Sequence, residues 1–408
     1  MFKRVLENKL FADTVWYTLS IVFARGLSLI VFPLLVKTLN EPDLLRYDLA
    51  LANIVLVMSA CIFGVDSAVG RLLKNKEIDR VGILNASYVM IVLQSIPSLI
   101  IFFIYIHIFE FELAWYDQCV LVTLIYCLLV VNQATNTAKW LLERSKVVKI
   151  QVTLGVAQSL LLLLAFVFGV LSFSVAIAAQ MTGAFIAAVY SCKLLQTKIR
   201  FCNLIQIMKS LFRNSFFLGL NTFIVALFVP LEKNFIFSAV NEVAAASYII
   251  HFKVGTLFTF GMSAFQMSFT PNVIDNLRNG QKLQYVVYIL LVILISSVTA
   301  ILYFLMASYV FRYFSTDHTY SYYTMSLILS IQLVILICSL LESIYVFHEK
   351  YRIIFFLNFA LVVTFVVVCL MANMNSVNAF LAVAAILLVT KLIIMAVANI
   401  WYLSNYTQ

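Results

Sequence analysis

Residues 11–36, FADTVWYTLSIVFARGLSLIVFPLLV, form an apolar stretch of 26 residues with Arg25 close to its middle. Such a stretch is too long for an ordinary core helix, and it has the roughly 20 residues that an α-helix needs to cross a bilayer. A guanidinium at that depth costs about 2.5–3.5 kcal/mol on insertion scales, so it should face other helices or a water-filled cavity. The stretch therefore predicts a membrane-spanning helix in which the buried cation, Arg25, has a functional role.

Similar stretches recur along the whole chain, which is 64% hydrophobic and 11% charged. This composition is far from that of soluble domains. The apolar runs predict twelve spans, at 11–36, 44–70, 81–106, 118–138, 150–170, 172–192, 214–238, 244–270, 284–311, 321–346, 353–372 and 377–401. No run alternates with the two-residue period of a barrel strand, so the spans are expected to be helices. The predicted class is an all-α, polytopic membrane protein.

Orientation follows from the basic residues. Most of the 27 Lys and Arg residues lie at the N-terminus and in every second loop. By the positive-inside rule, both termini and these loops are cytoplasmic. The net charge of +9 then reflects topology and contact with anionic lipids, and it is not taken as a sign of nucleic-acid binding.

The longest basic loop, residues 193–213, suggests the domain organisation because it separates two sets of six spans. We predict an N-terminal six-helix lobe at 1–192, a cytoplasmic basic linker helix at 193–213 and a C-terminal six-helix lobe at 214–408. Two halves that both start from the cytoplasm are typical of parallel-repeat transporters, with a central cavity between the lobes.

Common catalytic motifs are absent from the sequence. It contains no Walker loop, no GxGxxG and no HExxH, and its seven cysteines form no CxxC pair. The four histidines are dispersed. We therefore expect no cofactor, no metal site and no catalytic residues, and predict that the protein is not an enzyme.

Basic residues deep inside the spans are the candidates for binding an anionic cargo. Arg25 and Lys253 lie too deep to reach the interface easily, and Lys391 lies near the centre of the last span. One face of the first helix also carries Thr14, Thr18 and Ser28 beside Arg25. Such a polar stripe should face an aqueous cavity or a partner helix. A purely structural pairing of Arg25 or Lys253 with an acidic residue is the alternative.

Acidic residues inside the spans are the candidates for coupling transport to an ion, namely Asp66, Glu232 and Glu342. Each also has a plainer interpretation. Asp66 could pair with Arg71, Glu232 could belong to an ordinary ion pair with Lys233, and Glu342 could lie at the cytoplasmic interface.

Two further patterns concern how polar residues share helix faces. Asp48 and Asp66 are 18 residues apart, which is five helical turns, so one continuous helix would place them on the same face. Asp48 is also close enough to the outer interface to snorkel. Asn132, Asn136 and Lys139 end the fourth span on one face.

Two stretches carry a family resemblance. The first contains Gly26, Pro33, Glu41, Pro42, Asp43, Gly64, Ala68 and Arg71, and the second contains Glu232, Lys233, Tyr248, Lys253 and Pro271. The order of these residues resembles the sequence pattern of polysaccharide flippases, including O-antigen unit flippases. These belong to the multidrug/oligosaccharidyl-lipid/polysaccharide (MOP) exporter superfamily. The chain departs from the family pattern at Leu45, where Gly is usual, and at Glu232, where Asp is frequent.

The resemblance implies a flippase in the bacterial inner membrane. Its cargo would be undecaprenyl-pyrophosphate-linked oligosaccharide, the repeat unit of O-antigen or a related polysaccharide, with a polysaccharide polymerase and a chain-length regulator as candidate partners. A diphosphate loses its hydration in hydrocarbon, and fixed cations in a wet cavity would offset that loss. An ion gradient is the expected energy source, since no ATPase motif is present.

Rival functions stay open at this point. A drug/cation antiporter of the same superfamily would share the layout, but it should favour an acidic cavity, whereas deep cations outnumber deep anions here. An integral-membrane polysaccharide polymerase would normally carry a large extracytoplasmic loop, and the longest predicted one spans only residues 107–117.

Arg25 provides a direct test of the cation hypothesis. Arg25→Ala should abolish translocation of a polyprenyl-diphosphate oligosaccharide in proteoliposomes, because the diphosphate loses its charged partner. The variant should still be folded, as judged by a single symmetrical peak in size-exclusion chromatography. Full activity of the variant would remove Arg25 from the cargo site.

Overall fold

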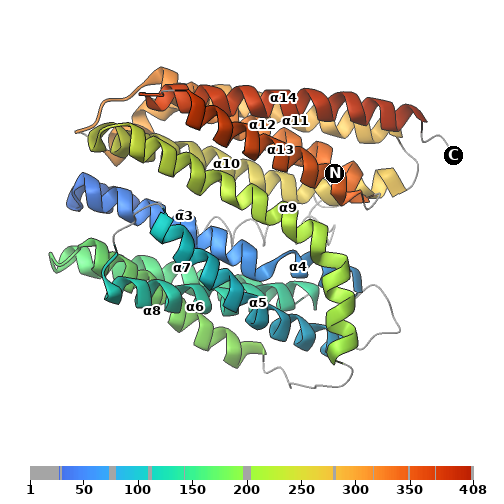
Figure 1. Cartoon of the computed structure of the whole chain (residues 1–408), viewed down its shortest axis with the longest axis horizontal. Coiled ribbons are helices and arrows are strands. Elements are labelled where there is room, and N and C mark those ends of the chain that lie inside the picture. Colours follow the sequence, from blue (N-terminus) through green and yellow to red (C-terminus); the bar gives the residue numbers. More distant parts are fainter. Residues whose placement is uncertain are drawn as a thin grey trace, which may run out of the picture. The chain divides into compact units, whose positions relative to one another are not determined.

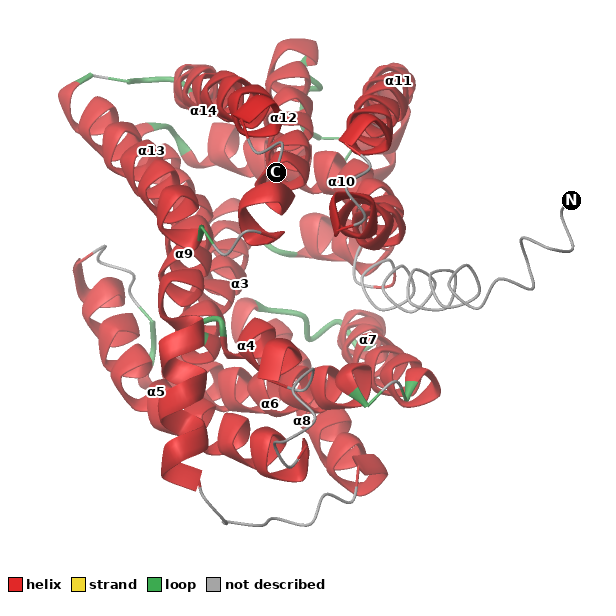
Figure 2. Ribbon diagram, turned by 90° about the vertical axis from the view of Figure 1, so that its right-hand side faces the viewer, coloured by secondary structure: helices red, strands yellow, loops and turns green. Residues whose placement is uncertain are grey.

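The computed structural model describes residues 27, 30–72, 80–108, 113–141, 143–195, 204–278, 282–315, 317–347, 350–372 and 374–405. Across these ranges the protein is built of α-helices and loops without a strand (Figures 1 and 2). The helices are α3 (Glu41–Ile62), α4 (Val65–Leu72), α5 (Arg80–Ile108), α6 (Trp115–Trp140), α7 (Arg144–Val167), α8 (Phe173–Leu195), α9 (Leu204–Ala239), α10 (Glu242–Arg278), α11 (Lys282–Phe314), α12 (Tyr322–Phe347), α13 (Tyr351–Met371) and α14 (Val377–Asn405).

Within the described residues, eleven helices are long and apolar enough to cross a membrane. They correspond to the predicted spans after the first, so the predicted all-α, polytopic class is confirmed. Most of the predicted first span, Arg25 included, lies outside the described residues. Residues 30–38, at its end, are helical.

The chain forms two compact units, one ending at Asn234 and the other beginning at Phe235. In the first unit, α3 packs on α5 and α6, and α8 packs on α6 and α7. In the second, α10 packs on α11 and α12, and α14 packs on α12 and α13. The same order of contacts therefore occurs twice, as expected for parallel repeats.

Part of the predicted linker forms the beginning of a long helix. Residues 204–213 are the first turns of α9, which continues to Ala239. The boundaries predicted for the two lobes, and the cavity predicted between them, stay predictions.

The second predicted span is not one continuous helix, and that expectation is wrong. Phe63 (φ 41°) and Gly64 (φ 71°) both adopt the left-handed conformation, which ends α3 before α4 begins. Glycine adopts this conformation without strain, whereas Phe63 does so at a cost. Because the helix is interrupted, Asp48 on α3 and Asp66 on α4 do not share one continuous face.

The interruption fits against α9 at a close backbone contact. A Cβ atom on Gly64 would lie 2.7 Å from the Gly219 nitrogen and 2.9 Å from the Ser215 oxygen. A Cβ atom on Gly219 would in turn overlap the Phe63 carbonyl and ring. The Phe63 and Phe216 rings meet edge to face at 6.1 Å. Gly64 and Gly219 are therefore both required where α9 crosses the break between α3 and α4, because a Cβ atom has no room at either position.

The crossing predicts a specific loss of stability. Gly219→Ala should destabilise the protein by about 1–3 kcal/mol, because the methyl group has no room beside Phe63. The matched control is Gly261→Ala on α10, where nothing lies within 4 Å of the added Cβ. Alanine should be neutral or slightly stabilising there. Unfolding midpoints of the two variants in detergent decide the matter, and equal midpoints would contradict the close contact.

Candidate functional site

The predicted functional residues fall on several helices of both units. Asp66 on α4 and Glu232 on α9 belong to the unit that ends at Asn234. Lys253 on α10, Glu342 on α12 and Lys391 on α14 belong to the other unit. Arg25 lies outside the described residues.

Glu342 and Lys391 form an ion pair between α12 and α14. The Lys391 Nζ atom lies 2.7 Å from Glu342 Oε1, and the two side chains are 10% and 20% exposed, respectively. A residue predicted to bind cargo is thus in direct contact with one predicted to couple ions. Both side chains are thus mostly buried by protein, and a part of each stays exposed.

Hydrogen bonds fix the two helices on either side of this pair. Asn399 Nδ2 on α14 donates to the Leu341 carbonyl on α12 at 3.3 Å. Nearer the other helix ends, Thr324 Oγ1 on α12 donates to Asn378 Oδ1 on α14 at 2.8 Å. The charged pair therefore lies in an interface between α12 and α14 that other hydrogen bonds also hold together.

A second ion pair, between Asp48 on α3 and Lys233 on α9, is far more buried. The side chains are 0% and 3% exposed, respectively. The snorkelling expected for Asp48 is therefore wrong, because its carboxylate lies inside the unit with a cationic partner. Next to it, Gln180 Nε2 on α8 donates to Tyr47 Oη at 3.1 Å. A buried pair of this kind holds helices together, since separating the charges leaves each without hydration.

Glu232 precedes Lys233 on α9 and is also buried, at 3% exposure. Lys233 forms an ion pair with Asp48, and the interpretation that Glu232 belongs to an ion pair with Lys233 stays a prediction. The signal that the sequence offered was two opposite charges at similar predicted depth in different spans, Asp48 and Lys233.

Asp66 is held by a line of amides on α6. Asn136 Nδ2 donates to Asp66 Oδ2 at 2.7 Å and to Asn132 Oδ1 at 3.0 Å. Lys139, one turn further, is close enough to interact electrostatically with the carboxylate. The predicted shared face of Asn132, Asn136 and Lys139 is consistent with these contacts, and its partner is Asp66. Carboxylate and amide oxygens are ligands that hard cations prefer.

Lys253 is half-buried on α10, beside residues that fasten this helix. Tyr303 Oη donates to the Val254 carbonyl, and Gly255 packs against Ile328 and Gln332 of α12. No group of three or more His, Cys, Asp or Glu side chains within the described ranges is arranged to hold a metal ion.

Comparison with known proteins places this architecture. The family model described as "Polysaccharide biosynthesis protein" matches residues 10–267. No curated protein matches the chain.

Solved structures with the same fold are transporters. A MOP superfamily transporter from Pyrococcus furiosus, described as having a binding pocket of reverse polarity that suggests a different function, has a TM-score of 0.70 at 11% identity, over 99% of this chain and 98% of that chain. A MATE protein in complex with MaL6 has a TM-score of 0.68 at 12% identity, over 98% of both chains. An outward-facing multidrug resistance MATE family transporter has a TM-score of 0.67 at 11% identity, over 98% of this chain and 97% of that chain. At such identities the likeness establishes the fold.

The buried pair generates a stability prediction. Lys233→Met should lower the free energy of unfolding by about 3–5 kcal/mol, because the Asp48 carboxylate stays buried without its cation. The double variant Asp48→Leu/Lys233→Met should recover most of that loss. Denaturant unfolding in detergent measures both, and a single variant as stable as the unmodified protein would show that the pair is not needed.

Proposed function

The chain belongs to the polysaccharide biosynthesis protein family, and from this premise we propose that it is a transporter that moves a lipid-linked oligosaccharide across the bacterial inner membrane. The cargo would be an undecaprenyl-diphosphate-linked repeat unit. The cytoplasmic placement of both termini, inferred from the basic loops, belongs to the same proposal. Its fold is that of MOP superfamily transporters.

The observation that carries the proposal is the partly exposed pair of Glu342 and Lys391. An ammonium group offers three hydrogen-bond donors, which suit phosphate oxygens. While Glu342 is ionised, its carboxylate competes with the cargo for Lys391. The diphosphate must therefore displace this carboxylate or wait until it is neutralised.

Protonation of Glu342 would allow the cargo to replace this carboxylate as the partner of Lys391. A proton binds to the carboxylate, the ion pair is lost, and the Lys391 ammonium becomes available to a phosphate oxygen. When the cargo leaves, Glu342 releases the proton and the ion pair forms again. One proton therefore leaves with each cargo molecule, so an inward proton gradient does not drive this step. Proton and anionic cargo therefore strengthen each other's binding, by the same factor in both directions.

The sign of this coupling separates the proposal from the second candidate function. The fold is also that of MATE proteins, and Glu342 is an anionic group in the membrane, so a drug/cation antiporter has a specific basis. A cationic drug would bind to the ionised carboxylate and compete with the proton. Affinity for an anion should thus be higher when Glu342 is neutral than when it is ionised, whereas affinity for a cationic drug should be lower.

The Glu342→Gln variant tests this exchange. At neutral pH this variant should bind a polyprenyl diphosphate more tightly than the unmodified protein does. For a typical coupling energy the gain in affinity is about 5–150-fold. Its affinity should also lose the part of the pH dependence that the carboxylate causes, because the competing charge is gone. Binding to the purified protein in nanodiscs, compared between the variant and the unmodified protein, is the measurement.

Two further variants define the control and the contradicting result. Lys146→Met breaks an exposed pair with Glu143, formed at 2.9 Å with side-chain exposures of 30% and 38%, and should leave binding unchanged. The exchanged pair Glu342→Lys/Lys391→Glu keeps an ion pair but moves the cation. Full transport by this double variant would mean that the pair is only structural. Tight binding of a cationic drug that weakens as the pH falls would favour the antiporter.

A further inference from the structure

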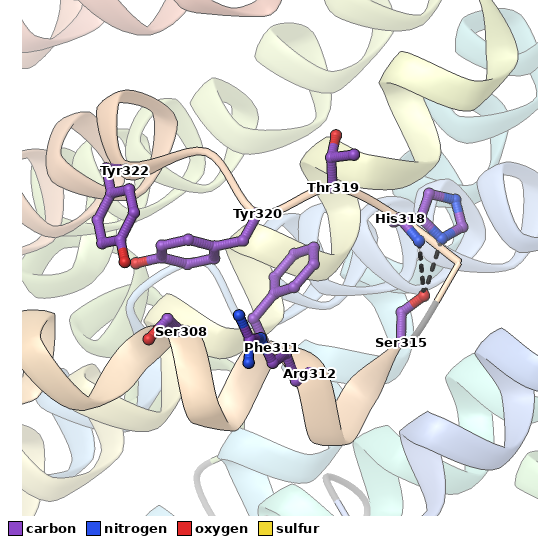
Figure 3. Close-up of a pocket in the computed structure, with 8 residues that line it drawn as sticks. All are labelled: Ser308, Phe311, Arg312, Ser315, His318, Thr319, Tyr320 and Tyr322. Atoms are coloured by element: carbon purple, nitrogen blue, oxygen red, sulfur yellow. Dashed lines mark hydrogen bonds between the residues drawn. The ribbon is translucent and has the colours of Figure 1, made fainter.

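A separate polar cavity of about 420 Å³ lies where α11 passes into α12, outside the ion pairs described above. Figure 3 shows the side chains around it, which include Phe311, Arg312, Ser315, His318, Tyr320 and Tyr322. The apolar spans end at Phe314 and restart at Tyr322, so the cavity is at the membrane boundary. On the predicted topology this boundary is the extracytoplasmic one. The volume is in the range of small-ligand sites, about 300–1,000 Å³.

Aromatic rings build one side of the cavity and keep it in shape. The Tyr320 and Tyr322 rings meet edge to face at 4.8 Å, and Phe311 meets Tyr320 at 5.4 Å. Behind them the His251 ring of α10 stacks on Tyr320 at 5.5 Å. His251 Nε2 also accepts a hydrogen bond from the Ser321 backbone N–H at 2.9 Å. The loop is therefore fastened to α10, and the site is preorganised.

Polar atoms beside the cavity lack partners among the described residues. The Ser315 hydroxyl lies 2.9 Å from His318 Nδ1. Within the part of the chain that the structure describes, His318 Nε2 and Tyr320 Oη are buried and have no hydrogen-bond partner. Buried polar atoms without partners are rare in native proteins. Burial raises the pKa of the Tyr320 hydroxyl to about 12, so this group keeps its proton at neutral pH and can donate it.

Arg312 gives the cavity a charge. Its side chain is exposed at the end of α11 and is part of the lining. A guanidinium binds a carboxylate through two parallel hydrogen bonds. The lining thus combines a carboxylate-binding group, hydroxyl and imidazole groups that bind sugar hydroxyls, and ring surfaces for the apolar face of a sugar.

We propose that this cavity is a binding site for a sugar residue that carries a carboxylate, such as a hexuronic acid. The proposal deepens the proposed function, because the glycan of the cargo is the source of such a sugar at the extracytoplasmic face. The site holds the acidic residue of the glycan after the lipid-linked diphosphate has crossed. It selects cargo by composition, separately from the diphosphate.

Ligand binding to the whole protein tests the site without requiring transport. The protein is placed in nanodiscs of phosphatidylcholine, which carries no net charge, and titrated with glucuronate, glucose and inorganic phosphate. Saturable binding of glucuronate, at least about tenfold tighter than that of glucose, is expected because a charge-assisted pair with Arg312 is gained. Equal binding of the two sugars overturns the proposal, as does phosphate binding as tight as that of glucuronate.

Variants locate the binding. Arg312→Ala should weaken glucuronate binding at least about tenfold and leave the weak glucose binding unchanged. Tyr320→Phe should weaken both sugars, because it removes a donor but no charge. Arg46→Ala, which removes an exposed Arg of α3, is the matched control and should bind as the unmodified protein does. Unaltered glucuronate binding by Arg312→Ala would place the ligand elsewhere and overturn the assignment.

Transport distinguishes the failure of this site from the failure of the proposed function. Unmodified protein that translocates a lipid-linked oligosaccharide in proteoliposomes but binds no glucuronate refutes the sugar site alone. Glucuronate binding without any translocation, in contrast, refutes the flippase and retains the site.

Discussion

Polar groups in hydrocarbon must find their partners within the protein, and the rest of the structure depends on this constraint. The long helices satisfy their own backbone groups. Charged side chains also need partners, and the two pairs of oppositely charged residues described within the spans, Asp48 with Lys233 and Glu342 with Lys391, each join two different helices. These two pairs therefore act as specific links between helices, and cargo can reach Lys233 or Lys391 only by competing with its carboxylate partner.

Close packing supplies the second kind of link. The interruption at Phe63 and Gly64 turns the chain from α3 to α4, and it is also the place where α9 makes a close backbone contact, at Gly219. In a membrane, where hydrophobic burial does not bring helices together, small residues allow the contact that dispersion forces need. The pair of glycines and the buried ion pair of Asp48 thus both connect α9 to the segment that contains α3.

The sequence was informative where the physical signal is local and less so where it depends on neighbours. Hydropathy depends on each segment alone, so the spans and the helical class could be predicted. Hydropathy does not show which helices touch. For this reason the sequence predicts separate roles for Glu342 and Lys391, and it places Asp48 at the interface. The break at Gly64 was missed because one glycine in an apolar run rarely ends a helix. The cavity beside Arg312 was missed because its polar residues are ordinary for a loop.

The two ion pairs differ in exposure, and therefore in the free energy that is needed to separate their partners. Separating charges costs more free energy the less water can replace the lost partner. Asp48 and Lys233, at 0% and 3% exposure, have no such replacement, and their pair suits a permanent link. Lys391 and Glu342, at 10% and 20%, keep part of their surface uncovered by protein, so protonation or an incoming phosphate can replace one partner at a moderate cost. A transporter needs both kinds, one to keep its helices together and one that opens for its cargo.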